Sequence, residues 1–421
     1  MVLNIHHRRG LSVVAMALAC SPAPLYAQYI GKAAPSLRVS DPEYTSLGLN
    51  LGPIKVFSDI DFDLTYDDNV FAESTAENSD FLLTVTPKTE LRYQTGNIAL
   101  RGFASAAYRR FADLSSENST AAVVEGDAAW QPRIGESVTA LGGWTRGVED
   151  RGDPEARNDT SVGPRLSDIF TGRLGYNRQR GKISFKVDGE VRKYNNLSSL
   201  DADRNLTSYA GRMTVGHRIS GNVFATASGF FTKRDFRIPV NIFGVNRNAE
   251  TYGGRLGIQM DPGGVVEGSA SVGMFHLDSA GQNTISPSGT VVDPDYNGLS
   301  IDASVTYRPR QRTAITLDAF RGDVATFRLG AVARTDTQVA LGVQQEVRHN
   351  IYAQLSGFYR ESKFRGLGAN EQIVGLEARA EYLFNRYTAL GITGRYSKRD
   401  SDELTEKYSR FRGGVEARFS F

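Results

Sequence analysis

The stretch Asp59-Ile60-Asp61-Phe62-Asp63-Leu64-Thr65-Tyr66 places an apolar or aromatic side chain at every second position. Three aspartates and a threonine fill the alternate positions. Successive side chains of a β-strand point to opposite faces, so this strand would have one apolar face and one acidic face. An acidic face is costly to bury in a dry protein core without partners. The stretch therefore predicts a strand with lipid on one side and a watery lumen on the other.

The same period of two continues from about residue 55 to the end of the chain. In residues 182–192, Lys, Ser, Asp, Glu and Arg occupy the even positions, and apolar residues and a glycine occupy the odd ones. Residues 410–421 alternate in the same way and end on an aromatic side chain. Such a final strand is typical of bacterial outer-membrane barrels. We therefore predict that Phe419 and Phe421 form the insertion signal read by the barrel-assembly machinery.

The connections between the predicted strands alternate between short and long. Eight short turns lie at residues 94–97, 132–136, 178–182, 220–222, 261–264, 309–312, 348–350 and 385–386. Nine long loops, rich in Asp, Asn, Ser, Gly and Pro, lie near residues 69–79, 112–119, 150–165, 196–206, 237–248, 278–297, 323–334, 364–370 and 399–407. Short periplasmic turns and long external loops are a habit of outer-membrane barrels. We predict an all-β, transmembrane, antiparallel up-and-down barrel of about eighteen strands, within a range of 16 to 20.

Other fold classes explain the sequence less well. No apolar run approaches the ~18 residues of a membrane-spanning helix, which excludes a polytopic helical protein. A propeller would need a repeat of about 40 residues with a fixed motif, which the chain lacks. A soluble sandwich would not place charge on nearly every second residue beside a uniformly apolar face.

The N-terminal residues read as a targeting segment. Residues 1–27 contain a basic pair, Arg8-Arg9, then a short apolar run and a small-residue site after Ala27, as in a secretory signal peptide. Cys20, the single cysteine of the chain, also resembles a lipidation site, and this alternative stays open. Residues 28–54 read as a periplasmic segment, either a plain extension or a partial plug of the barrel mouth. Residues 55–421 then form the barrel.

The charge of the chain is balanced. There are 49 Lys and Arg against 47 Asp and Glu, and without Arg8 and Arg9 the two counts are equal. A nucleic-acid-binding protein would show a basic excess or patch, so that class is excluded.

The predicted lumen face also carries both signs. It includes Asp59, Asp61, Asp63, Glu90, Lys182, Lys186, Asp188, Glu190, Arg212, Arg218, Asp302, Arg308, Arg412 and Arg418. A lumen without one dominant sign argues against a strongly selective ion channel. Nearly every aromatic residue that follows the alternation falls on the lipid face, so the pattern assigns no aromatic residues to a path through the lumen.

Catalytic and metal-binding patterns are weak. Outside the leader, the histidines His217, His276 and His349 are far apart, and no G-x-S-x-G motif is present. His276 is the one candidate base for a barrel enzyme, although an interfacial histidine explains it better. The aspartates of the opening stretch share a strand face and cannot wrap a calcium ion as a loop does. We therefore expect no enzyme activity, no metal and no cofactor.

The segment Tyr66-Asp67-Asp68-Asn69-Val70-Phe71, followed by Asp80-Phe81 and Pro87, resembles the opening hairpin of a bacterial β-barrel porin family associated with exopolysaccharide export. The resemblance implies an outer-membrane exit channel that works with a periplasmic polysaccharide-export protein and an inner-membrane co-polymerase. It implies no catalytic residues. From the residues alone, Asp67, Asp68 and Asn69 are expected to form turn hydrogen bonds rather than to touch polymer.

Three other functions remain open at this stage. The barrel could be a general diffusion or uptake porin, a structural or adhesive surface protein, or an enzyme acting on envelope lipids.

Overall fold

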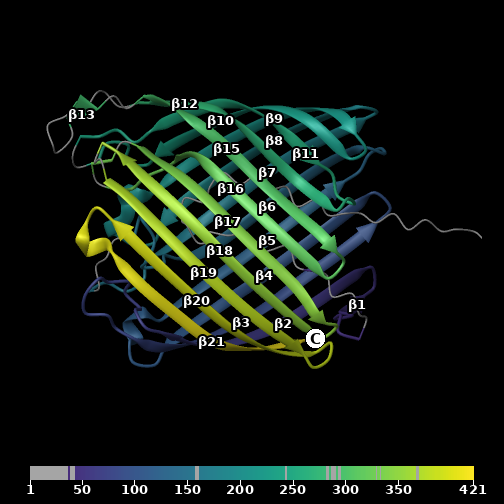
Figure 1. Cartoon of the computed structure of the whole chain (residues 1–421), viewed down its shortest axis with the longest axis horizontal. Helices are drawn as coiled ribbons and strands as arrows, with labels where there is room; N and C mark the ends of the chain where they lie inside the picture. The colour runs from purple at the N-terminus through teal and green to yellow at the C-terminus, as the bar shows by residue number, and fades with distance from the viewer. Residues whose placement is uncertain are drawn as a thin grey trace, which may run out of the picture.

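The chain folds into a closed antiparallel β-barrel of eighteen strands (Figure 1). The computed structural model describes residue 37 and residues 43–156, 161–241, 244–280, 284–285, 291–292, 295–328, 330–331, 333–366 and 369–421. The barrel strands are β2 (Ile54–Asp67), β3 (Asp80–Thr95), β4 (Ile98–Phe111), β5 (Ser119–Trp130), β6 (Glu136–Val148), β7 (Leu166–Arg180), β8 (Ile183–Asn196), β9 (Leu206–Ser220), β10 (Val223–Phe236), β11 (Ala249–Met260), β12 (Val266–Ser279), β15 (Tyr296–Arg310), β16 (Thr313–Val324), β17 (Ala333–Arg348), β18 (Ile351–Arg365), β19 (Ala369–Leu383), β20 (Thr388–Ser401) and β21 (Tyr408–Ser420). The predicted all-β barrel of eighteen strands is confirmed.

A few short elements accompany the barrel. They are β1 (Leu49–Leu51), which pairs with β2, the hairpin of β13 (Thr284–Ile285) and β14 (Val291–Val292), and the 3₁₀ turns η1 (Ser115–Glu117), η2 (Ser199–Arg204) and η3 (Leu404–Glu406). Within the described part of the chain, no helix has the length and apolar character needed to cross a membrane.

The barrel closes between its first and last strands. β2 pairs with β21 from Asp59 opposite Ser420 to Asp67 opposite Arg412. At this seam the rings of Phe62 and Phe419 meet edge to face, with centroids 6.1 Å apart. Closure matters because a sheet in lipid must satisfy the hydrogen bonds of every strand and cannot leave an open edge.

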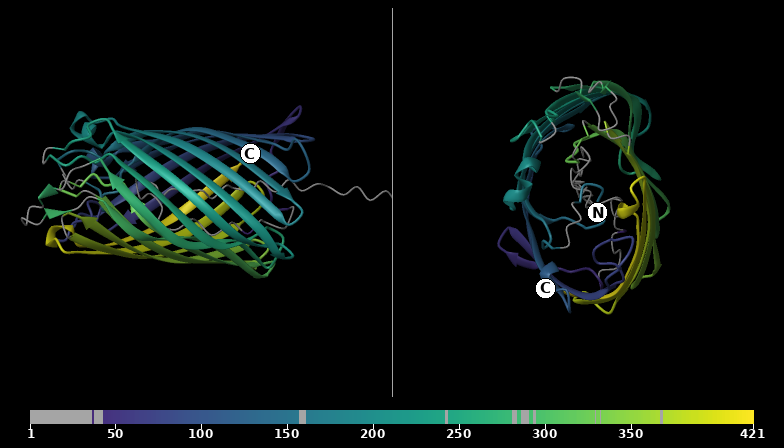
Figure 2. Two further views of the ribbon diagram at one scale, coloured as in Figure 1. Left: turned by 90° about the horizontal axis from the view of Figure 1, so that it is seen from above. Right: turned by 90° about the vertical axis from the view of Figure 1, so that its left-hand side faces the viewer.

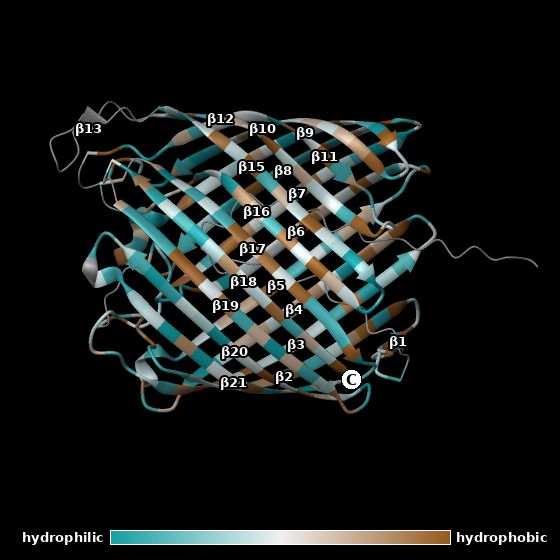
Figure 3. Cartoon of the chain, in the orientation of Figure 1, coloured by the Kyte–Doolittle hydropathy of each residue, from teal (hydrophilic) through white to brown (hydrophobic). Residues whose placement is uncertain are grey.

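Hydrophobic and hydrophilic residues alternate along the strands of the wall (Figure 3). Along β2, Phe62, Leu64 and Tyr66 are each about 40% exposed on the outer face. On the inner face of the same strand, Asp61 pairs with Lys88 of β3. The strand alternation therefore separates an apolar outer band from a charged interior.

The connections separate the barrel into two different ends. The nine long connections gather at one end, here called the long-loop end, and the eight short ones at the opposite, short-turn end (Figures 1 and 2). All seventeen connections lie within a few residues of their predicted positions. Seen along its axis, the barrel is oval (Figure 2).

The predicted signal peptide, including Cys20, lies outside the described residues. One residue of the predicted N-terminal segment, Leu37, is buried inside the short-turn end. It packs against Tyr352 and Leu383, and its backbone N–H donates to Gln344 Oε1 at 2.7 Å. At least this residue therefore lies within the barrel mouth.

Candidate functional site at the long-loop end of the lumen

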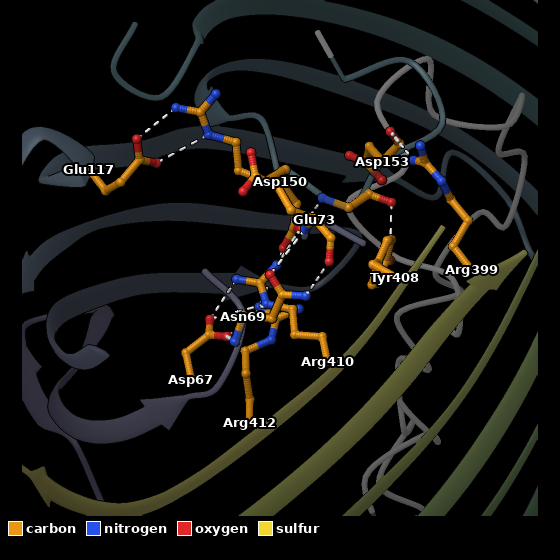
Figure 4. Close-up of polar contacts among 12 residues, drawn as sticks. Asp67, Asn69, Glu73, Glu117, Asp150, Asp153, Arg399, Tyr408, Arg410 and Arg412 are labelled. Atoms are coloured by element: carbon orange, nitrogen blue, oxygen red, sulfur yellow. Dashed lines mark hydrogen bonds and ion pairs between the residues drawn. The ribbon is translucent and has the colours of Figure 1, made fainter. Parts of the chain in front are cut away.

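The connection between β6 and β7 turns into the barrel instead of projecting away from it. Its residues 151–155 are all buried, although they belong to a polar loop of sequence Arg-Gly-Asp-Pro-Glu. We call residues 149–156 the inward loop. Figure 4 shows it reaching the closing seam, where β2 and β21 meet.

A buried arginine joins the seam to the inward loop. Arg410 of β21 forms an ion pair with Asp67. Its Nε donates to Oδ1 at 2.9 Å, and its Nη2 donates to Oδ2 at 2.5 Å. Its Nη1 donates to Asp150 Oδ1 at 3.0 Å, and Arg412 reaches Asp150 Oδ2 at 3.3 Å. A forked guanidinium that binds two carboxylates is a strong and directional tie. The inward loop is therefore attached to the seam by charged hydrogen bonds.

The hairpin that carries the family resemblance, residues 66–71, positions Asp67 for its ion pair with Arg410. The backbone N–H of Asn69 donates to Asp67 Oδ1 at 3.2 Å, and Asn69 Nδ2 donates to the Ser409 carbonyl at 3.1 Å. The Phe411 N–H donates to Asp68 Oδ1 at 2.7 Å. These bonds hold the loop after β2 against β21.

The three apolar members of this hairpin lie on different sides of the wall. Val70 is 2% exposed in a small core with Leu82, whereas Tyr66 lies on the outer face against Phe81, with ring centroids 5.3 Å apart. The Phe71 ring lies 5.7 Å from the guanidinium carbon of Arg151. The hairpin thus packs inward through Val70 and Phe71.

Other ties reach the inward loop from the opposite parts of the wall. Arg151 pairs with Glu117 of η1, from Nη2 to Oε1 at 2.6 Å. Glu155 accepts from Arg334 Nη1 of β17 at 2.7 Å, and its carbonyl accepts from Arg204 of η2 at 3.2 Å. The inward loop is therefore held on several sides at once (Figures 2 and 4). Because it crosses the lumen, we also call these residues, 149–156, the strap.

The centre of the strap is Gly152-Asp153. The Tyr408 hydroxyl donates to the Gly152 carbonyl at 3.2 Å, and a Cβ added to Gly152 would lie 2.5 Å from that hydroxyl, so a side chain there would displace the tyrosine. Arg399 donates to the Asp153 carbonyl at 3.1 Å. The Asp153 carboxylate lies 3.9 Å from Arg360, and its Oδ2 has no hydrogen-bond partner among the described residues.

Two aspartates of the strap, Asp150 and Asp153, have opposite pKa shifts. Burial raises the pKa of Asp153 to about 8, against the weaker lowering effect of Arg360. Burial also acts on Asp150, but Arg410, Arg412 and the Gly152 N–H together hold its pKa well below the usual range. Asp150 therefore stays ionised at all ordinary pH values, whereas Asp153 titrates near neutrality.

The strap should consequently loosen as the pH rises. With the loop inward, Asp153 binds a proton up to about pH 8, whereas a carboxyl in a loop released to water loses it near its ordinary value of about 4. Protonation therefore favours the inward state, and that stabilisation is lost as the pH rises from about 4 through 8. We expect the conductance of the purified channel in planar bilayers to rise between about pH 6 and 9.

Asp153→Asn, which imitates the protonated acid, should remove this pH response and keep the conductance at its low-pH value. The exposed loop residue Glu77 provides the matched control, and Glu77→Gln should respond to pH like the wild type. A pH response that survives in Asp153→Asn would contradict the assignment.

The residues predicted to face the lumen fall into three groups. Asp188, Glu190 and Arg212 come together around one cavity of the inner wall. Lys186 lies 3.8 Å from Asp188. Arg412 belongs to the tie on Asp150, as described above.

The remaining predicted lumen residues lie closer to the short-turn half or the seam. Arg418 pairs with Glu381 at 2.7 Å, Lys182 is exposed at the turn between β7 and β8, and Asp63 accepts from Thr65. Asp59 lies on β2 opposite Lys88 and Ser420. Phe419 and Phe421 are exposed on the outer face at the seam, where the Phe421 N–H donates to the Ser58 carbonyl.

Several aromatic side chains lie inside the barrel. Phe224, Phe236 and Phe275 are buried in the interior, and Phe230 and Phe320 line the inner-wall cavity. The sequence contains a local signal for this, because Phe230 and Phe231 are adjacent and adjacent strand residues point to opposite faces.

Catalytic and metal-binding arrangements remain weak in three dimensions. Among the described residues, no three His, Cys, Asp or Glu side chains are grouped so as to hold a metal ion. His276 lies on β12, where its ring contacts Tyr252 at 5.2 Å between centroids and its Nδ1 lies 3.0 Å from Asn297 Oδ1. Neither neighbour is a nucleophile paired with a general base.

Comparison with known proteins gives one family match. Residues 41–421 match the family described as putative beta-barrel porin 2. No curated protein matches the chain.

Several solved outer-membrane structures are similar in outline. The siderophore receptor PirA from Pseudomonas aeruginosa is 11% identical, with a TM-score of 0.44, and the match covers 87% of this chain and 80% of that one. The FrpB iron transporter from Neisseria meningitidis is 8% identical, with a TM-score of 0.44 and coverage of 86% and 81%. A loop-deletion mutant of OmpT, an outer membrane protein of Vibrio cholerae, is 10% identical, with a TM-score of 0.39 and coverage of 87% and 99%. Scores this low support no inference about function.

Proposed function

The chain belongs to the putative beta-barrel porin 2 family, and from this premise we propose that it is an exit channel for a secreted exopolysaccharide in the outer membrane of a Gram-negative bacterium. The long-loop end would face outward and the short-turn end the periplasm, as is usual for such barrels. The chain would be inserted by the barrel-assembly machinery.

The width of the barrel supports a channel. Barrels of 16–18 strands are wide enough to leave an aqueous path unless something fills it. The interior carries many charged side chains, and the described ones are largely arranged in ion pairs. A polymer chain could slide along such a surface because paired charges offer hydrogen bonds without one dominant sign.

The observation that carries the proposal is the strap. A channel of this width that serves an intermittent polymer would have to be closed between export events, and an inward loop could close it. The inward loop crosses the lumen, and the contacts that hold it there are ion pairs and hydrogen bonds that polar polymer groups could exchange. A periplasmic polysaccharide-export protein would deliver the polymer to the short-turn end, next to Leu37.

The direct test is a clean deletion strain with a complemented control. We expect polymeric carbohydrate in medium and capsule to fall, to accumulate in the periplasm, and to return on complementation. Unchanged export would refute the proposal. Uptake of small solutes through the purified barrel would then favour a general diffusion porin.

A further inference from the structure

The inner wall contains a cavity apart from the strap. It lies along strands β7 to β12 and β15 to β16, with a volume of about 110 Å³. One water molecule occupies about 10–15 Å³ of such space, so the cavity has room for roughly seven to eleven waters, comparable with one sugar residue. Ligand sites are commonly concave places of this kind with a few convergent polar groups.

Arginine dominates the polar lining of this cavity. Its five guanidinium groups belong to Arg173, Arg192, Arg212, Arg234 and Arg255. The lining carboxylates are Asp188, Glu190 and Asp323, and a fourth carboxylate, Asp302, pairs with two of the lining arginines. Counting all four, the cavity still carries one more arginine than carboxylates.

The carboxylates of this cavity are shared between arginines. Glu190 pairs with both Arg173 and Arg192, the latter at 2.8 Å. One oxygen of Asp302 accepts from Arg212 at 3.1 Å and from Arg255 at 3.0 Å. Each guanidinium has about five N–H donors, so the five arginines place many donors around the cavity. Such a surface favours an additional carboxylate, which arginine can bind through two parallel hydrogen bonds.

The cavity lining includes buried polar atoms without a hydrogen-bond partner among the described residues. Asp323 Oδ1 and Arg234 Nε are examples, on side chains that are 2% and 7% exposed and that pair with each other through other atoms. A buried polar atom without a partner is costly, and a polar group bound in the cavity would supply partners to these two atoms. Asp323 Oδ1 can accept from a hydroxyl, and Arg234 Nε can donate to an oxygen.

Aromatic rings supply the apolar part of the lining. The Phe230 ring lies over Gly253 on the neighbouring strand, where an added Cβ would come within 2.6 Å of it. The guanidinium of Arg255 lies 4.3 Å from the centre of this ring. Phe320 lines the same cavity. Rings beside hydrogen-bonding groups match a sugar, which has an apolar C–H face and polar edges.

We propose that this cavity binds an acidic sugar residue, a uronic acid, of the exported polymer. The carboxylate would lie among the arginines, the hydroxyls would meet Asp323 and Arg234, and the ring would lie against Phe230 or Phe320. The inference deepens the proposed function and rests on it, because it names the class of polymer.

Binding of two oligosaccharides to the full-length purified chain tests the assignment. Tetragalacturonate and maltotetraose have the same number of sugars and differ in charge. By titration calorimetry in detergent, tetragalacturonate should bind at least tenfold more tightly, and added salt should weaken it. Equal affinity for the two, or no binding of tetragalacturonate, would overturn the inference.

A pair of matched variants locates the site. Arg212→Gln removes one cavity guanidinium that is 22% exposed, and Asp302 keeps its contact with Arg255. Arg379→Gln removes an inward arginine of β19, on the opposite part of the barrel. The first should weaken tetragalacturonate binding at least fivefold, and the second should leave it unchanged. Equal losses in both variants would place the binding elsewhere in the lumen.

The same experiment separates this inference from the proposed function. If tetragalacturonate binds as expected while the deletion strain exports normally, the acidic-sugar site stands and the export function fails. If export depends on the barrel while only the neutral oligosaccharide binds, the opposite conclusion follows.

Discussion

Replacing residues 151–156 of the inward loop with a Gly-Ser sequence of the same length is expected to raise the single-channel conductance several-fold. The replacement removes the side chains of Arg151 and Glu155, which pair with Glu117 and Arg334 and hold the loop inside the lumen. A Gly-Ser segment behaves as a flexible coil and offers no charge to these groups. Planar-bilayer recordings of the purified barrel at constant pH and salt provide the measurement.

The control for this replacement is a short turn at the other end of the barrel. Replacing residues 262–264, in the short turn between β11 and β12, with Gly-Ser should leave the conductance unchanged. If both replacements gave wild-type conductance, the inward loop could not be the barrier to flow. An unboiled sample that migrates as a folded barrel on a gel verifies that each variant is intact.

Arg410→Ala should lower the free energy of unfolding by about 3–5 kcal/mol, because it leaves the carboxylate of Asp67 buried without its counter-charge. Asp67 is 1% exposed, so water cannot easily replace the guanidinium. Urea unfolding of the chain in lipid vesicles gives the free energy. The same variant should also open the strap, because Asp150 then retains only Arg412 of its two arginines.

A double variant distinguishes loss of the pair from loss of packing. Replacing both partners, as Arg410→Met with Asp67→Leu, removes the uncompensated charge, and such replacements of buried pairs are often neutral or stabilising. The double variant should therefore recover most of the stability that Arg410→Ala loses, yet keep the strap open. A double variant as unstable as the single one would show that Arg410 acts mainly by filling space.

The barrel could be predicted from the sequence because each strand carries its own pattern. Tyr66-Asp67 and Asp80-Phe81 mark the end of β2 and the start of β3. In the structure, β2 ends at Asp67 and β3 begins at Asp80. The positions of the polar turns and loops predict the number of strands in the same way. Such signals are local, so they need no knowledge of distant residues.

The strap could not be predicted because its signals are distant in sequence. Asp150 and Arg410 are 260 residues apart, and Glu155 and Arg334 are 179 residues apart. The loop itself has the composition of any exposed polar loop. Nothing in Arg151-Gly152-Asp153 distinguishes a segment that turns inward from one that projects into solvent.

The strap also bears on the width of the passage through the barrel. The barrel is oval in outline (Figure 2), and the inward loop connects β20 and β21 on one wall with η1 and η2 on another. None of these contacts belongs to the hydrogen-bond ladder between the strands. Release of the loop would therefore widen the passage while the closed wall of the barrel stays intact.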